Sequence, residues 1–366
     1  MFTIRYWQKE LAFEYPFTIS KGTKTHQPTF IVELNFRGIL GYGEAPAIAY
    51  YDITTDQMVA DLEAKRKFVE SFSLTDPKRF WHFLHHLFPN NPFLVCALDM
   101  AGWDIYGKLR RKPLYELWNL NLDKAPKTDY TVGIDSLEKM LEKIDAHPAP
   151  IYKIKVGTSD DLEKLKAIRK HTDAIIRVDA NAGWTFDQAM QIVPVLEELN
   201  IELIEQPLAK EDFEGTKVLK STTSIPIIAD ESCVGEKDVK KCAGYFSGIN
   251  IKLTKCSGIT PALEMIKKAR ALNLQVMLGI KLTKCSGITP ALEMIKKARA
   301  LNLQVMLGCM NESSIGTAAL AHLAPLVDFL DADGPLLLKE DIANGVTYTN
   351  HQLTITTGAG LTVKLF

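Results

Sequence analysis

From about residue 128 onward, the sequence alternates short apolar runs with longer amphipathic stretches such as 162–170, 186–199 and 290–301. Parallel strands that are buried on both faces and joined by helices have this pattern. Eight such units in succession predict an α/β fold, the (β/α)8 or TIM-type barrel. The predicted strands are 130–134, 151–156, 174–179, 201–205, 227–230, 249–253, 303–307 and 327–331. This count includes only one copy of a repeated segment that lies within 251–308.

The first 125 residues have a different, α+β pattern. Strands are predicted at 2–7, 29–36 and 39–42, with a hairpin turn at Arg37-Gly38, and helices at 55–70, 78–87 and 92–108. The end of the chain, 346–357 and 361–365, returns to strand-like alternation. We therefore expect an N-terminal capping domain (1–125), a barrel carrying the metal and catalytic residues (126–340), and a C-terminal segment that returns to the capping domain (341–366).

The composition narrows the classes of partner. The 43 Lys and Arg residues nearly balance 44 Asp and Glu residues, which indicates neither nucleic acid nor an anionic membrane as a partner. No apolar run is long enough to span a bilayer, and the start of the sequence does not have the pattern of a signal peptide. Six cysteines without C-x-x-C spacing predict free thiols in a reducing compartment. We expect a cytoplasmic protein, and a homo-oligomer is compatible with the sequence.

Residues 251–279 and 280–308 are identical over 29 positions. Because natural repeats diverge, this identity indicates a very recent duplication, an engineered one or an error in the recorded sequence. An intact-mass measurement would show whether both copies are present in the protein. One βα step separates Asp230 from Lys252, so we assign the sixth strand to the first copy. The seventh strand is assigned to the second copy, which leads into Cys309. We expect the surplus residues to be extruded, because a ninth strand would change the tilt and stagger of the barrel.

Ionisable residues end several predicted strands, and in such barrels the carboxyl ends of the strands form the active site. Asp179, Glu205 and Asp230 end three successive strands at separations of about one βα unit. Neighbouring strands lie about 4.8 Å apart, so the three carboxylates should converge. Their mutual repulsion favours a bound divalent cation, and an all-oxygen set of ligands favours Mg²⁺, with Mn²⁺ as the second choice.

Lysines flank these acids. The two-residue period of a strand places Lys153 and Lys155 on one face, and Lys252 ends the sixth strand on the other side of the barrel. A lysine near other cations has a lowered pKa and can act as a base. One base on each side of a planar intermediate would remove a proton from one face and return it on the other, which gives the epimer.

These residues resemble the enolase superfamily, in its muconate-lactonising branch. A lysine base and an ene-diolate stabilised by Mg²⁺ are known features of that superfamily. The eighth-strand motif 331–338 and the seventh-strand motif 308–313 are similar to those of the dipeptide epimerases. The other motifs that carry the resemblance are 97–104, 107–108, 153–155, 179–181, 205–207, 230–232 and 251–253.

The resemblance implies roles for individual residues. Asp331 and Asp333 would hold the free ammonium group of a dipeptide, as expected of two carboxylates facing one cation. Lys153 would stabilise the developing enolate oxygen, which leaves Lys155 and Lys252 as the bases. Further residues would contact the metal ligands (Asn181, Glu231) or bind the substrate and select its side chains (Thr23, Lys24, Tyr50, Met310).

The expected function is therefore that of a Mg²⁺-dependent dipeptide epimerase, which transfers a proton at the α-carbon of the C-terminal residue through an enolate. Other activities of the branch stay open: o-succinylbenzoate synthase, N-acylamino acid racemase and muconate cycloisomerase. Their substrates have no free ammonium group, so Asp331 and Asp333 argue against them. A non-catalytic metal-binding barrel is the remaining alternative, if the duplication disrupts the site.

Overall fold

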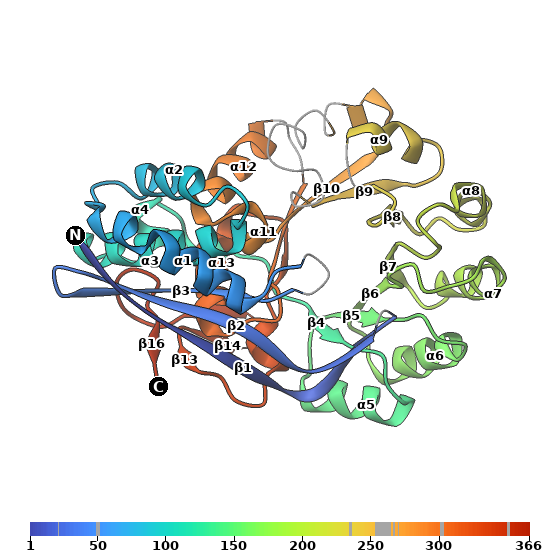
Figure 1. Cartoon of the computed structure of the whole chain (residues 1–366). Coiled ribbons are helices and arrows are strands. Elements are labelled where there is room, and N and C mark those ends of the chain that lie inside the picture. The colour runs from blue at the N-terminus through green and yellow to red at the C-terminus, as the bar shows by residue number, and fades with distance from the viewer. Residues whose placement is uncertain are drawn as a thin grey trace. The chain divides into compact units, whose positions relative to one another are not determined.

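The computed structural model describes the chain in two compact units (Figure 1). The first unit comprises residues 1–15, 25–126 and 280–366, and the second comprises 16–24 and 127–279. The described residues are all except 21, 49–51, 234–235, 253–264, 266–267, 270, 301–303 and 350–351, and the side chains of 236, 251–252, 275–279 and 304 are also outside the description.

An antiparallel sheet opens the first unit, with the order β1 (Phe2–Ile19), β2 (Gly22–Phe36) and β3 (Ile39–Pro46). The predicted hairpin turn is confirmed, since Arg37 and Gly38 both have positive φ between the paired residues Phe36 and Ile39. Strands β1 and β2 are longer than predicted. The alternation in β1 continues through buried Leu11 and Phe13, and the tip of this hairpin, residues 16–24, belongs to the second unit.

Four helices follow this sheet: α1 (Thr55–Ser71), α2 (Pro77–Leu87), α3 (Pro92–Arg110) and α4 (Leu114–Leu117). The first three confirm the predicted helices. Helix α3 is buried along most of its length and packs directly on β3. Two glycines of β3 allow this approach: a Cβ at Gly41 would stand 2.3 Å from the carbonyl oxygen of Ala101, and one at Gly43 would stand 1.9 Å from that of Ala97.

We predict that Gly43→Ala destabilises the first unit by about 2–3 kcal/mol, because the added methyl group must push α3 away from β3. The measurement is the free energy of unfolding in urea. Gly38→Ala is the control: its methyl group meets nothing within 4 Å, so only the left-handed φ opposes it, at a cost of about 1 kcal/mol. Equal losses in the two variants would contradict the close packing of α3.

The second unit has a parallel sheet of alternating strands and helices (Figure 1). Its strands pair in the order β10-β9-β8-β7-β6-β5-β4, and helices α5 to α8 line one side of them. In chain order the elements are β4 (Tyr130–Val132), α5 (Leu137–Ala146), β5 (Ile151–Lys155), α6 (Asp161–His171), β6 (Ile175–Asp179), α7 (Phe186–Leu196), β7 (Ile201–Glu205), α8 (Phe213–Ser221), β8 (Ile227–Ala229), α9 (Glu236–Cys242), β9 (Gly248–Lys252) and β10 (Gln275–Ile280).

Strand β10 corrects one prediction. The surplus residues were expected to be extruded, but the end of the first copy pairs in parallel with β9, from Gln275 opposite Gly248 to Gly279 opposite Lys252. The physical reason is the sequence of this segment, which is an apolar strand in both copies. In solvent it would expose apolar side chains, whereas in the sheet its backbone groups find hydrogen-bond partners. The fold is therefore a (β/α)8-type barrel with one added strand.

The first unit resumes after β10 with α11 (Leu282–Cys285), α12 (Ile288–Ala300), β11 (Gln304–Gly308), α13 (Ser314–Leu323) and β12 (Phe329–Asp331). The parallel pairing of β11 with β12 confirms that the second copy supplies the seventh predicted strand. Four short strands end the chain: β13 (Ala343–Asn344), β14 (Val346–Thr349), β15 (Gln352–Ile355) and β16 (Lys364–Leu365). The tail reaches α3, where the Leu361 N–H donates to Asp104 at 2.8 Å.

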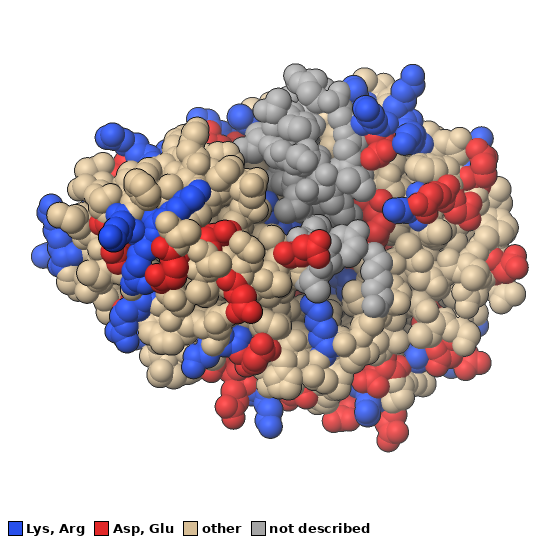
Figure 2. All heavy atoms as spheres, in the orientation of Figure 1, with Lys and Arg blue, Asp and Glu red and all other residues tan. Residues whose placement is uncertain are grey.

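The surface bears charges of both signs. In the face drawn in Figure 2, acidic and basic side chains are interspersed rather than gathered by sign. Within the described residues, no helix is both long and apolar enough to cross a membrane. Five of the six cysteines are described, and each is buried with a free thiol: Cys96, Cys233, Cys242, Cys285 and Cys309.

Candidate active site

One lysine and two acids lie side by side at the carboxyl ends of β5, β6 and β7. In the register of the sheet, Lys155 stands opposite Asp179, and Asp179 stands opposite Glu205. Asp230 directly follows β8, the next strand. The three acids are buried, with exposed fractions of 2%, 5% and 3% for Asp179, Glu205 and Asp230. Regular spacing of the βα units therefore places three carboxylates at one edge of the sheet.

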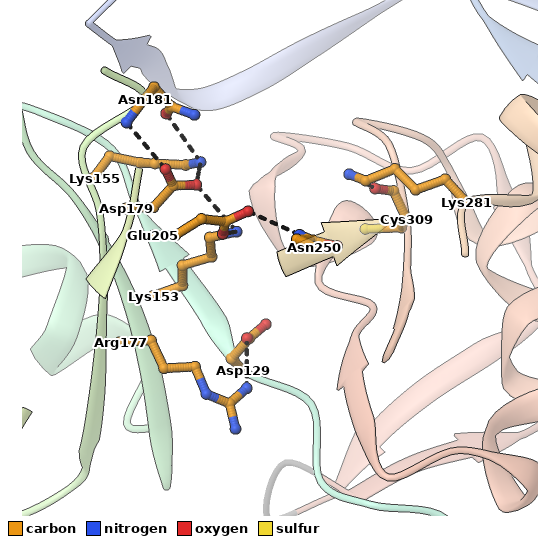
Figure 3. Close-up of polar contacts among 10 residues, drawn as sticks. All are labelled: Asp129, Lys153, Lys155, Arg177, Asp179, Asn181, Glu205, Asn250, Lys281 and Cys309. Carbon is orange, nitrogen blue, oxygen red and sulfur yellow. Dashed lines mark hydrogen bonds and ion pairs between the residues drawn. The ribbon is translucent and has the colours of Figure 1, made fainter. Parts of the chain in front are cut away.

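The two lysines of β5 point toward Asp179 and Glu205, as the period of two predicts (Figure 3). The Lys153 ammonium lies 3.2 Å from Asp179 and 3.1 Å from Glu205, so it bridges the two carboxylates. Lys155 contacts the same Asp179 oxygen at 2.6 Å. Ile154, between the lysines, is fully buried on the opposite face. The positive charges of both lysines thus offset the repulsion between neighbouring acids.

Two asparagines extend this network (Figure 3). Asn181 contacts Lys155 at 3.3 Å through its side chain and donates its backbone N–H to Asp179. Asn250 on β9 donates to Glu205 at 2.8 Å, a contact that the sequence analysis missed. The available signal was the two-residue period, because Asn250 lies on the same face of β9 as Lys252. Glu231 follows Asp230 and is partly buried.

The donor atoms at this edge suit a hard divalent cation. Asp179, Glu205 and Asp230 offer buried carboxylate oxygens from three adjacent strands. Carboxylate oxygens are preferred by Mg²⁺, while Zn²⁺ is usually held by histidine and cysteine, and the three predicted ligands are all carboxylates. The residues present therefore fit Mg²⁺.

A second group of acids lies in the first unit, at the ends of β11 and β12. Ligand atoms of Cys309, Asp331 and Asp333 lie within 4.8 Å of one another, and all three residues are buried. The Cys309 thiol is 3.6 Å from Asp333. Burial raises the pKa of this thiol well above its ordinary value, and the nearby carboxylates of Asp333 and Asp331 add to the effect. The cluster is thus a buried group of two carboxyl side chains with a thiol beside them.

Two further residues border this cluster and were not predicted as site residues. Lys281 donates its ammonium group to the Cys309 carbonyl at 2.5 Å (Figure 3). Burial raises the pKa of the Glu312 carboxyl well above its ordinary value, and Glu44 adds to the shift. Glu312 accepts a hydrogen bond from the Met310 N–H at 3.3 Å. Lys281 and Lys252 lie in identical local sequences, so only the fold distinguishes them.

The remaining predicted site residues differ in their exposure to solvent. Thr23 is exposed, and its hydroxyl contacts that of Thr18 at 3.0 Å. Lys24 is also at the surface, although partial loss of water around its ammonium group lowers its pKa. Met310 is partly buried against the core of the first unit. The Lys252 backbone ends β9, but its side chain, like the whole of Tyr50, lies outside the described residues.

Asp99 on α3 is a buried acid near the start of α12. It accepts hydrogen bonds from the backbone N–H and the hydroxyl of Thr289, at 3.0 and 2.9 Å. Burial raises the pKa of its carboxyl to about 7, although these hydrogen bonds oppose the shift. In the folded protein Asp99 therefore keeps its proton over a range of pH in which an unfolded chain would release it.

This shift predicts a pH dependence of stability. A raised carboxyl pKa contributes stability that is complete below pH 3.8, the ordinary value, and is lost as the pH rises through about 7. Asp99→Asn cannot titrate, so its free energy of unfolding should fall less between pH 4 and pH 7 than that of the parent chain. Urea unfolding of both chains across this range measures the difference. Parallel curves would contradict a raised pKa of Asp99.

Two family models match this sequence. The model described as "Mandelate racemase / muconate lactonizing enzyme, N-terminal domain" matches residues 1–118. The model described as "Enolase C-terminal domain-like" matches in two parts, residues 135–280 and 277–365. The two parts meet at the junction between the copies of the repeat, so each copy falls within a different part of the match.

Two relatives of this chain carry the name of the same activity. It is 44% identical over 336 residues to an L-Ala-D/L-amino acid epimerase of a Maribacter species, covering 92% of this chain and 91% of the relative. A protein of the same name from Flavobacterium johnsoniae is 42% identical, with 92% of each chain covered.

Among solved structures, the substrate complex of the L-Ala-D/L-Glu epimerase from Bacillus subtilis is 27% identical with a TM-score of 0.77, covering 99% of this chain and 98% of that one. The Enterococcus faecalis dipeptide epimerase with Mg and L-Leu-L-Tyr is 27% identical with a TM-score of 0.76, covering 98% of each chain. Fold, strand-end acids and sequence agree: this chain belongs to the mandelate racemase/muconate lactonizing enzyme family of the enolase superfamily.

Proposed function

We propose that this chain is a Mg²⁺-dependent dipeptide epimerase, an isomerase that inverts the α-carbon of the C-terminal residue of a dipeptide. The observation that carries the proposal is the buried pair Asp331 and Asp333. Two neighbouring carboxylates can hold an ammonium group by charge-assisted hydrogen bonds. A dipeptide has such a free group, whereas the acylated and succinylated substrates of related enzymes do not. The relatives named as dipeptide epimerases support the same conclusion.

Asp179, Glu205 and Asp230 would hold the metal ion in this proposal. When bound, Mg²⁺ would act as a Lewis acid that offsets negative charge developing on the substrate carboxylate. Lys153 bridges Asp179 and Glu205, so its ammonium group is placed at the same edge. It would donate a hydrogen bond to the oxygen on which charge develops.

Two lysines would exchange protons with the α-carbon. Lys155 would remove the α-proton from one face of the substrate, and Asp179 and Asn181 fix the position of its amine. The second base would come from the repeated segment. The sequence assigns it to Lys252, and the contact of Asn250 with Glu205 supports a position of β9 at the metal edge. A proton returned on the opposite face gives the epimer.

Other predicted site residues keep the roles that the sequence indicates. Thr23, Lys24, Tyr50 and Met310 would select the substrate side chains, and the lowered pKa of Lys24 fits a group that has lost water near a binding surface. Asn181 and Glu231 would support the metal ligands. The division into capping domain, barrel and C-terminal segment is also proposed, and the gap between the family models, which cover 1–118 and 135–365, supports its first boundary. A cytoplasmic location is supported by the free thiols among the described cysteines, and a homo-oligomer is compatible with it.

The test is a library of L,L-dipeptides incubated with the enzyme and Mg²⁺ in D₂O. Exchange of the α-proton of the C-terminal residue, followed by NMR, together with appearance of the L,D epimer, is the expected result. Asp331→Asn should weaken it by at least about 100-fold, because half of the charge facing the ammonium group is lost. Asp173→Asn, an exposed acid before β6, is the control. Absence of exchange in every dipeptide, with turnover of an o-succinylbenzoate precursor or an N-acylamino acid, would overturn the proposal.

A further inference from the structure

The two copies of the repeat have the same residues, and the second copy packs on helices α2 and α3 of the first unit. Thr289 donates its N–H and its hydroxyl to the two carboxylate oxygens of Asp99 on α3. Trp103 donates to the Thr289 hydroxyl at 2.8 Å, and Trp81 on α2 donates to the Ser286 carbonyl at 2.8 Å. We refer to Trp81, Asp99 and Trp103 as the docking surface.

The docking surface is occupied by the second copy. Both oxygens of Asp99 are used by Thr289. Gly287 has a φ of +126°, and a Cβ at this position would stand 2.3 Å from Asp99, so the loop lies directly against the carboxylate. The first copy carries the same residue types at Gly258 and Thr260. The contacts that engage Asp99 are those of Gly287 and Thr289 in the second copy.

The docked copy carries Lys281 to the cluster of acids. This lysine lies between Ile280, the last residue of β10, and the first residue of α11. Its ammonium group contacts the Cys309 carbonyl at 2.5 Å. A Cβ placed on Gly308 would stand 3.5 Å from the Lys281 Cε and 3.6 Å from the Asp331 Oδ2, so both side chains lie beside Gly308. The amine of Lys281 therefore borders the cluster of Asp331, Asp333 and Cys309.

We propose that Lys281 of the docked copy, rather than Lys252, is the second base of the epimerisation; this rests on the proposed function. In a dipeptide held by its ammonium group at Asp331 and Asp333, the reacting α-carbon is one peptide unit away, about 3.8 Å from the Cα that bears the ammonium group. The second base must therefore stand next to the acid pair, as Lys281 does.

The proton balance of the step is simple. The neutral amine of Lys281 accepts the α-proton and becomes an ammonium group, while the electron pair of the broken C–H bond passes into the substrate carboxylate. The ammonium form of Lys155 then donates a proton to the opposite face of the α-carbon, and a new C–H bond forms. In the reverse direction the two lysines exchange these roles, so no oxidant, reductant or co-reactant is needed.

The repeat supplies a matched pair of variants for the test, Lys281→Ala and Lys252→Ala in the full chain. We expect Lys281→Ala to lower the rate of epimerisation by about 10³-fold or more, at least 100-fold beyond the loss in Lys252→Ala. The Lys281→Ala variant should still exchange the α-proton of one epimer in D₂O, the one whose proton faces Lys155. An equal or larger loss in Lys252→Ala, or full epimerisation by Lys281→Ala, would overturn the assignment.

A second matched pair tests docking without reference to activity. Thr289→Val removes the hydroxyl that bonds to Asp99 and Trp103 on the docking surface, and it should lower Tm by about 3 °C or more. Thr260→Val, the same change in the first copy, should lower Tm by less than about 1 °C. Equal shifts would overturn the assignment of these contacts to the second copy. Failure of the proposed function would give a different result, because the parent chain would then exchange the α-proton of no dipeptide. The two threonine variants would still report which copy makes the contacts with Asp99.

Discussion

Lys155→Ala should abolish epimerisation of every dipeptide substrate, with a loss of about 10³-fold or more, the usual contribution of a general base. The side chain ends β5 beside Asp179, and its amine is the group expected to exchange a proton with one face of the substrate. The variant should keep α-proton exchange for the epimer whose proton points away from Lys155. Proton NMR in D₂O with each purified epimer measures this asymmetry.

Two further variants test whether Lys155 acts as a base or only through its positive charge. Lys155→Arg keeps the positive charge beside Asp179 but cannot lose its proton near neutral pH, so it should be as inactive as Lys155→Ala. Lys166→Ala, an exposed lysine on α6, should retain the full rate. Folding should survive these changes, because Lys153 still compensates Asp179. If Lys155→Arg turned over at the parental rate, Lys155 would be an electrostatic residue and the two-base mechanism would be wrong.

Removal of the metal should have an effect of similar size. We expect chelation to lower the epimerase activity by at least about 10³-fold and added Mg²⁺ or Mn²⁺ to restore it, because charge developing on the substrate carboxylate would otherwise lack a cation. Saturating Mg²⁺ should also stabilise the folded chain, by about 2.7 kcal/mol at one hundred times its Kd. Thermal unfolding with and without Mg²⁺ provides a measurement that does not depend on substrate.

The matched variants for this prediction lie on one strand. Glu205→Gln removes a carboxylate from the predicted ligand set and should lose both activity and most of the increase in Tm with Mg²⁺. Glu202→Gln, also on β7, changes an acid that pairs with Arg177 and should keep the Mg²⁺ response. Full activity of the chelated enzyme, after elemental analysis has shown that metal is absent, would contradict the role of Asp179, Glu205 and Asp230.

Much of this arrangement follows from local rules. The period of two placed Lys153 and Lys155 on one face of β5, and the regular length of a βα unit placed Asp179 and Glu205 opposite each other in the register. Both rules act over a few residues or one repeat unit, so the sequence contains them directly. The same rules identify the turn at Arg37, where two residues of positive φ join paired strands.

The fate of the repeat could not be predicted by the same rules. Identical residues have identical local preferences, so patterns alone cannot say which copy docks on α3 or whether the surplus strand enters the sheet. Those outcomes depend on partners far away in the sequence, such as the contact of Thr289 with Asp99, 190 residues apart. The contact of Lys281 with Cys309 has the same origin. Long-range packing, rather than propensity, decides between equal segments.

Strand β10 crosses the junction of the two copies, and this gives the duplicated chain a chemical fingerprint. Its first residues, from Gln275, end the first copy, and its last, Ile280, begins the second. Trypsin cleaves after arginine and lysine, so digestion after Arg270 and Lys281 releases the peptide 271–281. Loss of either copy leaves one and the same sequence, in which Gly308 is followed by Cys309 and this peptide no longer exists. A single fragment in a digest therefore reports whether a cell makes the strand at all.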